Sequence, residues 1–157
     1  MLITGGKMEN WPKLDLQPLN DNGMCYGCGQ NNPIGLKMKF NWDARTKTAS
    51  ADFVPGENLQ GWAGFVHGGI IACVLDEAMG WVAMFAGTHN VTARMQVRYR
   101  QMVPIGQSYK VSCTITRQNS RLIETEAVIT DRDGRVYAEG NSIQFIVNRP
   151  EGNAVKS

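Results

Sequence analysis

GWAGFVHGGIIACVLDEAMGWVAMFAG, residues 61–87, is the longest apolar run in the chain and the stretch on which its fold depends. The run predicts a helix that begins near His67 and ends at Gly87, since glycine is a natural helix terminator. A helix that is apolar on nearly every side is a buried helix. Asp76 and Glu77 stand in its middle, and an unpaired buried carboxylate is costly or shifts its pKa. A reaction beside Asp76 would account for this anomaly.

The start of the predicted helix is equally unusual, because two glycines follow His67. The first N–H groups of a helix lack intrahelical partners and carry partial positive charge. At Gly68 and Gly69 no side chain covers them, so a carbonyl can approach and a developing oxyanion would be stabilised. Asp76 is nine residues beyond His67, about 13 Å along the axis. One helix therefore cannot bring both groups to one carbonyl, whereas two helices related by a dimer axis can.

Alternating polar and apolar residues on both sides of this helix predict strands. They run over residues 35–42 and 48–53 before it, and over 91–99, 109–116, 123–129 and 135–147 after it. The last four are joined by short turns, which favour antiparallel neighbours. One long helix on one antiparallel sheet is the simplest two-layer arrangement. The helix is too apolar for one sheet face to cover it, so we expect an isologous dimer.

Length and composition predict a single domain. We expect an irregular arm over residues 1–34, one domain over 35–148 and a polar tail over 149–157. The net charge of +2 is too small to indicate a nucleic acid or membrane partner. No secretory signal is visible, and Asp76, Glu77 and Gly80 interrupt the apolar run, which disfavours a transmembrane helix. We therefore expect a cytoplasmic protein with reduced thiols.

The chain has four cysteines, of which Cys25 and Cys28 form the one close pair. No second pair or histidine follows at zinc-site spacing, so the sequence gives little support to a structural zinc or a redox role for this pair. Cys73 and Cys113 stand at apolar positions and are expected to be small core residues.

Two stretches resemble a known family. GFVHGGIIACVLDEAMGW resembles the His-Gly-Gly helix signature of hotdog-fold thioesterases of the phenylacetic-acid-degradation (PaaI-like) type. CYGCGQNNPIGL, from Cys25 to Leu36, is similar to the lead-in of one branch of these proteins. The resemblance covers roughly Cys25 to Val147. It implies an α+β hotdog fold, in which one antiparallel sheet of about six strands wraps a long buried helix. It also implies an acyl-CoA thioesterase that needs no metal or organic cofactor and forms a homodimer or a dimer of dimers.

The resemblance assigns roles to particular residues. It makes Asp76 the nucleophile or general base and the Gly68 amide the donor to the thioester carbonyl, and His67 positions the thioester. A hydroxyl residue on the strand after the helix, here Thr92, assists. The family often has Asn or Gln six residues before the His. That position is Gly61 here, so Gln60, one residue earlier, is the candidate if the following loop is kinked.

The further candidates concern substrate binding. Gly69, Glu77 and Arg94 are secondary candidates for substrate binding. The basic residues that could bind the nucleotide phosphates of CoA are Arg94, Arg98, Arg100 and Lys110. A solvated strand face explains any single one of these basic residues equally well.

Other interpretations stay open at this point. The glycines can form only a tight turn, His67 can be a helix cap, and the two carboxylates can be a wetted stripe. A non-catalytic acyl-CoA sensor would keep the pocket but would not need Asp76. Hotdog hydratases and dehydratases usually carry a His-Phe-Pro pattern or a carboxylate five residues before the His, where this chain has Trp62.

Overall fold

The computed structural model describes residues 21–147. The predicted arm over 1–34 is therefore described only from residue 21, and the predicted tail over 149–157 lies outside the described residues. Within this range two strands precede one long helix and four strands follow it, as the sequence predicts. In chain order the elements are β1 (Asn41–Asp43), β2 (Thr48–Phe53), the 3-10 turn η2 (Glu57–Leu59), α1 (Gly68–Phe85), β3 (His89–Tyr99), β4 (Tyr109–Gln118), β5 (Leu122–Thr130) and β6 (Val136–Val147).

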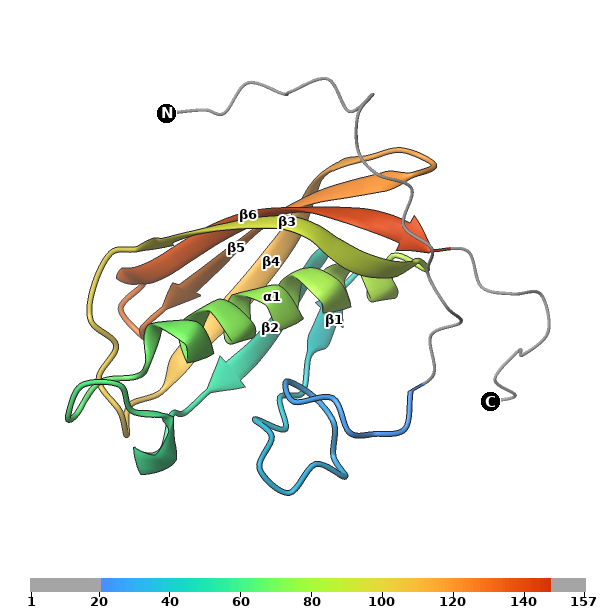
Figure 1. The fold of residues 1–157 in the computed structure, drawn as a ribbon. Helices are drawn as coiled ribbons and strands as arrows, with labels where there is room; N and C mark the ends of the chain where they lie inside the picture. The colour runs from blue at the N-terminus through green and yellow to red at the C-terminus, as the bar shows by residue number, and fades with distance from the viewer. Residues whose placement is uncertain (1–20, 148–157) are drawn as a thin grey trace.

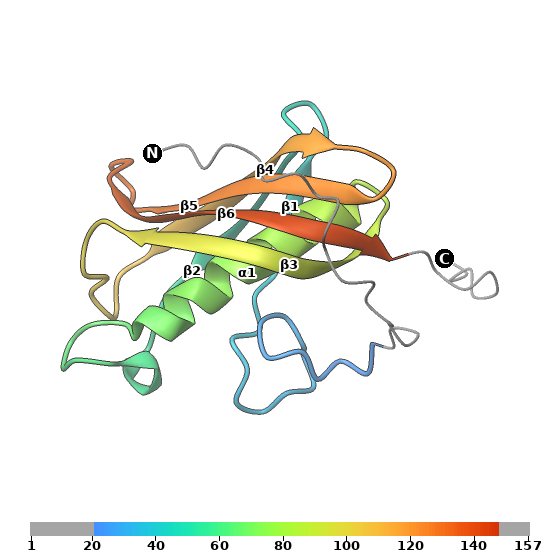
Figure 2. The same ribbon diagram turned by 45° about the horizontal axis from the view of Figure 1, so that its top comes forward.

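The strands form one antiparallel sheet of six strands in the order β1-β2-β4-β5-β6-β3. The helix α1 connects β2 to β3, which lies at the opposite edge of the sheet from β1 and β2. Figure 1 shows α1 lying across one face of the curved sheet, and Figure 2 shows β3 at the edge beside β6. This is the two-layer arrangement predicted from the sequence.

One face of α1 packs on the sheet and forms the core with it. The residues on this face are buried: Ile71, Val74, Leu75, Ala78, Met79, Val82 and Ala83. Complete burial of a large aliphatic side chain contributes about 1.5–3 kcal/mol, so this face explains why the helix forms here. The helix packs tightly on Gly140 of β6, where an added Cβ would lie 3.0 Å from the Met79 methyl carbon.

The opposite face of α1 is open in the single chain. It carries mostly small residues: Gly69 and Met84 are exposed, and Cys73, Asp76 and Gly80 are partly exposed. By length and composition α1 is also the one helix of the described residues that could cross a membrane. In this fold its apolar side is the side that packs on the sheet.

The first predicted strand is much shorter than expected. The alternation over 35–42 predicts a strand of that length, but β1 spans only Asn41–Asp43. The backbone turns at Lys37, which has a φ of 51°. The amides of Leu36 and Met38 then bond to the carbonyls of Tyr26 and Gly27, at 2.7 and 2.9 Å, rather than to the sheet. The preceding loop is thus attached to the domain just before β1.

Candidate functional site

His67 caps the N-terminus of α1. Its backbone is extended (φ −61°, ψ 136°), and its Nδ1 accepts a hydrogen bond of 2.9 Å from the Gly69 amide. This bond satisfies one of the unpaired N–H groups of the first turn. Because Nδ1 accepts, the proton of the neutral ring lies on Nε2. Of the interpretations that the sequence left open for His67, the helix cap is the one that the structure confirms.

Gly68 is the first residue of the helix. Its carbonyl accepts a 2.9 Å hydrogen bond from the Tyr99 hydroxyl at the end of β3. No acceptor within residues 21–147 binds its amide. A Cβ at Gly68 would meet only the Tyr99 ring, at 3.6 Å, which is ordinary contact. Of the two amides that the glycines leave without a side chain over them, the Gly69 amide is therefore taken by His67, and the Gly68 amide has no partner in the described residues.

Asp76 is bound by Thr92. The Thr92 hydroxyl donates a hydrogen bond of 2.7 Å to Asp76 Oδ1 and joins the middle of α1 to the first half of β3. A carboxylate with a donor of this kind is held in one orientation. The structure thus brings together two of the predicted site residues that are 16 positions apart in the sequence.

A β-bulge makes this contact possible. Thr92 pairs with Gln144, but Arg94 pairs with Ile143, so Ala93 is the extra residue. Strict alternation would place Thr92 on the same face of the strand as Arg94. The bulge reverses the alternation, so that Thr92 shares the helix side of the sheet with Met95. Re-aiming a side chain is a recognised effect of a bulge.

Gln60 lies in the loop before α1, and its side chain forms hydrogen bonds within that loop. Its side-chain oxygen accepts from the Gly64 amide, and its amide nitrogen donates to the Glu57 carbonyl at 2.9 Å. The loop is kinked at Gly64, where φ is 85°. The kink that the sequence interpretation required is present, but the structure does not bring Gln60 to the Asp76–Thr92 pair.

Glu77 points away from Asp76, toward the loop that precedes β1. Trp81 Nε1 donates to Glu77 Oε1 at 3.1 Å, and the Cys25 thiol lies 3.6 Å from Oε2. Burial and the nearby Glu77 carboxylate raise the pKa of the Cys28 thiol. Glu77 therefore belongs to a different group of side chains from the one around Asp76.

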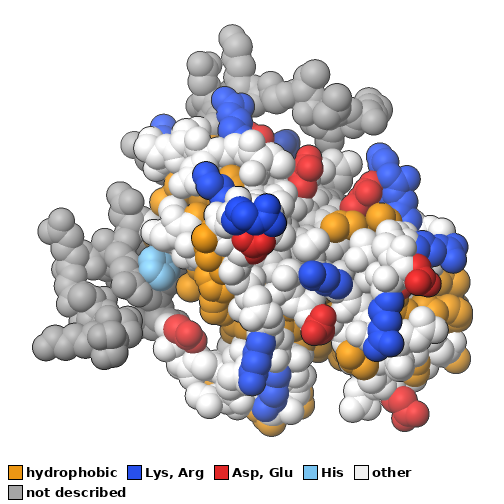
Figure 3. Space-filling view, turned by 180° about the vertical axis from the view of Figure 1, so that it is seen from behind, with side chains coloured by type: hydrophobic (Ala, Val, Ile, Leu, Met, Phe, Trp, Pro, Cys, Tyr) orange, Lys and Arg blue, Asp and Glu red, His pale blue; other side chains and the backbone are white. Residues whose placement is uncertain are grey.

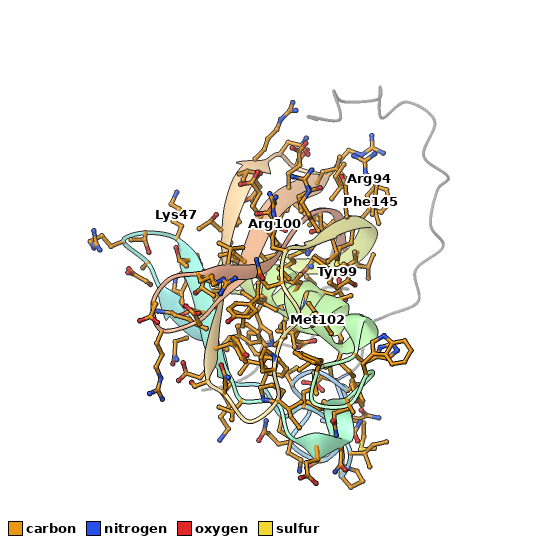
Figure 4. The ribbon with its side chains drawn as sticks, turned by 90° about the vertical axis from the view of Figure 1, so that its left-hand side faces the viewer. Lys47, Arg94, Tyr99, Arg100, Met102 and Phe145 are labelled. Atoms are coloured by element: carbon orange, nitrogen blue, oxygen red, sulfur yellow. The ribbon has the colours of Figure 1, made fainter. Side chains whose placement is uncertain are left out.

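The basic residues of β3 lie on the outer face of the sheet. Arg94 and Arg98 pair with Ile143 and Glu139 of β6, whereas the alternate residue Gly140 contacts the helix. Arg98 and Arg100 both reach the Glu139 carboxylate. Figure 4 shows Arg94 well separated from Tyr99, which marks the helix N-terminus. Within one chain the structure therefore does not bring Arg94 to Gly68 or Asp76.

Charges of both signs are mixed over the surface. On the face turned away in Figure 1, Lys and Arg side chains lie among Asp and Glu side chains (Figure 3). Three of the ion pairs in the described residues are Arg98–Glu139, Arg100–Glu139 and Arg117–Glu124, all at the surface. This face forms no continuous basic surface of the kind that binds nucleic acids.

Two hollows lie elsewhere on the single chain. One of about 1010 Å³ lies between the loop before β1 and the end of β2, lined by Tyr26, Ile34 and Val54 among others. The other, of about 820 Å³, lies along β3 to β6 and includes Arg94 and Arg98. Neither is lined by Gly68 or Asp76. The Asp76–Thr92 pair instead lies on the open side of the helix.

A buried polar network next to Thr92 was not anticipated from the sequence. The Thr125 and Ser142 hydroxyls lie 2.8 Å apart, and Gln144 donates to Ser142 at 3.2 Å and accepts from Asn90. Gln144 is fully buried and is the cross-strand partner of Thr92. The sequence signal for it was that Ser142 and Gln144, two alternate residues of β6 on its buried face, are polar. These partners satisfy one another, so the network fixes the sheet beside the site.

Comparisons with known proteins agree with this architecture. The family model described as the thioesterase superfamily matches residues 63–138, from the loop before α1 into β6. Human acyl-coenzyme A thioesterase THEM5 is 24% identical over 128 residues, which cover 79% of this chain and 52% of that protein. Mouse acyl-coenzyme A thioesterase THEM4 is 30% identical over 108 residues, or 60% of this chain and 46% of that protein. The chain thus spans about half the length of these relatives.

Solved structures share the fold. The thioesterase superfamily protein RHA08564 has a TM-score of 0.74 at 21% identity, over 88% of this chain and 70% of that chain. The Escherichia coli PaaI protein has a TM-score of 0.67 at 12% identity, over 73% and 82%. Protein smu.793 of Streptococcus mutans, bound to acetyl CoA, has a TM-score of 0.67 at 15% identity, over 73% and 91%. With its one helix packed on this six-stranded antiparallel sheet, the chain has the hotdog fold of these structures, and its residues 63–138 match the thioesterase superfamily.

Proposed function

We propose that this protein is an acyl-CoA thioesterase. Asp76 acts as general base or nucleophile, and the Gly68 amide stabilises the oxyanion. The observation that carries the proposal is the Thr92–Asp76 hydrogen bond, because a bulge re-aims Thr92 to make it. An acyl-CoA substrate is supported by the relatives, which are named acyl-coenzyme A thioesterases, and by the structural neighbour solved with acetyl CoA. A module that only binds acyl-CoA would not need a carboxylate oriented by a hydroxyl.

The reaction requires only these groups and water. As general base, Asp76 removes a proton from water while the water oxygen attacks the thioester carbonyl. The carbonyl oxygen becomes an oxyanion next to the Gly68 amide. The C–S bond then breaks, and Asp76 returns its proton to the leaving sulfur, which gives a carboxylic acid and the CoA thiol. As nucleophile, Asp76 would instead attack the carbonyl and displace the CoA thiolate, leaving a mixed anhydride. Water hydrolyses the anhydride and supplies the proton of the CoA thiol, so the products are the same. Removing an oxyanion donor costs about 10²–10³ in kcat.

The active site is proposed to be shared between two subunits. Within one helix Gly68 and Asp76 are eight residues apart, about 12 Å along the axis. Two features favour a second copy over the open side of α1. β3 forms an edge of the sheet over 11 residues and pairs, within the described residues, with β6 alone. A long unprotected edge of this kind is a template for another strand, and the exposed helix face beside it is made of small residues.

The test uses substitutions that separate the proposed groups from folding. Asp76→Asn should lower kcat for acyl-CoA by about 10²–10⁴ at unchanged thermal stability. Gly68→Pro removes the amide proton at the first helical position, where proline is tolerated, and His67 already has the extended backbone required before proline. Gly68→Ala, the matched control, keeps the amide and should retain most of the activity.

Mixing the two inactive variants tests the shared site. A heterodimer of Asp76→Asn and Gly68→Pro chains has one site with both groups intact. An equimolar mixture, unfolded and refolded together, should regain roughly a quarter of wild-type activity. No recovery would place both groups in one chain. Wild-type protein that binds acyl-CoA in a calorimeter but releases no thiol from short, long, branched or aryl acyl-CoAs would overturn the enzymatic assignment in favour of a sensor.

A further inference from the structure

Cys25 and Cys28 lie against Glu77 of α1. One donor atom from each of the three residues lies within 4.8 Å of the other two. The sequence gave the cysteine pair no third donor at zinc-site spacing, because the third donor comes from a helix 49 residues beyond Cys28. We propose that Cys25, Cys28 and Glu77 bind a zinc ion that fastens the loop before β1 to the middle of α1.

The distances suit a tetrahedral ion. Typical Zn–S and Zn–O bonds of about 2.3 and 2.0 Å give a sulfur-to-oxygen separation of about 3.5 Å around a tetrahedral zinc. Cys25 Sγ lies 3.6 Å from Glu77 Oε2 and 3.9 Å from Oε1. These two donors are thus already at the spacing that a shared zinc requires, without movement of the loop or the helix.

The loop is built to bring its thiols to the helix. Gly27 is buried, and a Cβ there would lie 2.3 Å from Glu77 Oε2. A Cβ at Gly29 would lie 2.4 Å from the Gly23 carbonyl, and the Gly29 amide bonds to the Cys25 carbonyl at 2.8 Å. Glycines between and after the two cysteines therefore allow the backbone to close tightly around the carboxylate. This requirement explains the Cys-Tyr-Gly-Cys-Gly pattern in physical terms.

The surroundings hold the proposed ligands in place. Trp81 Nε1 donates to Glu77 Oε1 at 3.1 Å and so fixes the carboxylate, as partners of metal ligands usually do. The loop itself is anchored by the amides of Leu36 and Met38, which bond to Tyr26 and Gly27. A site held in this way pays little ordering entropy when it binds an ion.

The donor set selects the kind of metal. Two thiolates and one carboxylate suit zinc, whereas Mg²⁺ and Ca²⁺ prefer oxygen donors alone. Three protein ligands leave the fourth tetrahedral position to water. Binding converts two thiols to thiolates and releases their two protons to solvent. This site is separate from the proposed catalysis, so its test does not use thioesterase activity.

The experiment measures zinc on the full chain without a histidine tag. Protein purified under reducing conditions is stripped with a chelator and titrated with Zn²⁺ against a chromophoric chelator. We expect one zinc per chain and strong visible absorption when Co²⁺ replaces it. Cys25→Ser and Cys28→Ser should abolish this binding, and Glu77→Gln should weaken it at least about tenfold. Cys73→Ser, the matched control on the same helix, should bind as wild type.

Mapping thiol alkylation on the wild-type protein guards against variants that misfold. Zinc should protect Cys25 and Cys28 from iodoacetamide and leave the rate at Cys73 unchanged. The proposal is overturned if stripped wild-type protein takes up no more zinc than the Cys25→Ser, Cys28→Ser double variant. It is equally overturned if Glu77→Gln binds zinc as wild type.

Discussion

The hydroxyl of Thr92 donates a 2.7 Å hydrogen bond to Asp76, and the bulge at Ala93 turns Thr92 toward the helix to make it. The bulge shifts the alternation of β3, so residues before and after Ala93 follow different phases. Beyond the bulge, Met95 and Tyr99 continue along the helix side, while Arg94 and Arg98 face outward. The carboxylate in the apolar helix is thus not an unpaired buried charge. It is partly exposed, and its polar partner comes from the neighbouring strand.

Replacing Thr92 by valine should lower kcat and leave the fold intact. Valine keeps the shape but removes the donor, and a hydrogen bond to a charged group contributes about 1.5–3 kcal/mol. If the bond acts mainly in the transition state, kcat falls roughly 10- to 100-fold at similar KM. Steady-state thiol release measures this. Thr92→Ser keeps the hydroxyl and should stay within about threefold of wild type; equal losses in both variants would contradict a role for the hydroxyl.

Removing the Tyr99 hydroxyl should have a smaller effect. Tyr99 donates to the Gly68 carbonyl and so positions the first turn of α1. A neutral bond of this kind contributes about 0.5–1.5 kcal/mol. Tyr99→Phe should therefore lower kcat roughly 2- to 10-fold. The phenyl ring stays against Gly68, so the melting temperature should fall by no more than a few degrees. An unchanged kcat would show that the helix N-terminus is positioned without this bond.

The network beside the site predicts a loss of stability in one variant. Ser142→Ala removes the partner of both Thr125 and Gln144, and all three side chains are buried. Leaving buried polar groups unsatisfied costs about 1–3 kcal/mol, measurable by urea unfolding. Asn141→Ala, at an exposed position of the same strand, should change the free energy of unfolding by less than about 0.5 kcal/mol. Similar values for the two variants would mean that the network does not stabilise the sheet.

Cys73 should react slowly with thiol reagents at neutral pH. Burial first, and then the charges of Glu77 and Asp76, raise the pKa of Cys73 to about 11. The neutral thiol is therefore favoured in the folded state. Its contribution to stability is fully present below the ordinary pKa of 9.0 and is lost as the pH rises through about 11. The alkylation rate of Cys73, followed by peptide mass spectrometry, should still be rising with pH beyond 9.0 and should reach its midpoint at about 11. A midpoint at or below 9.0 would contradict the prediction.

Much of the fold was readable from local pattern. The order of strands and helix follows from periods of two and of 3.6 residues, and the helix bounds at Gly68 and Phe85 lie close to the predicted start near His67 and end at Gly87. The strand over 35–42 was overestimated, because its apolar alternation persists while its backbone bonds to the loop over 26–27 instead. Alternation predicts which face of the backbone each side chain lies on. It does not predict which backbone groups form hydrogen bonds with one another.

The sequence by itself determined the helix, its His-Gly-Gly start and the presence of Asp76 within it, because these depend on neighbours along the chain. Only the tertiary structure decided which side chain meets which carboxylate. Thr92 reaches Asp76 because one extra residue in β3 reverses the alternation, and Cys25 reaches Glu77 because a glycine-lined loop folds back on the helix. Both contacts join residues far apart in the sequence. They arise from sheet register and loop closure, which no local period encodes.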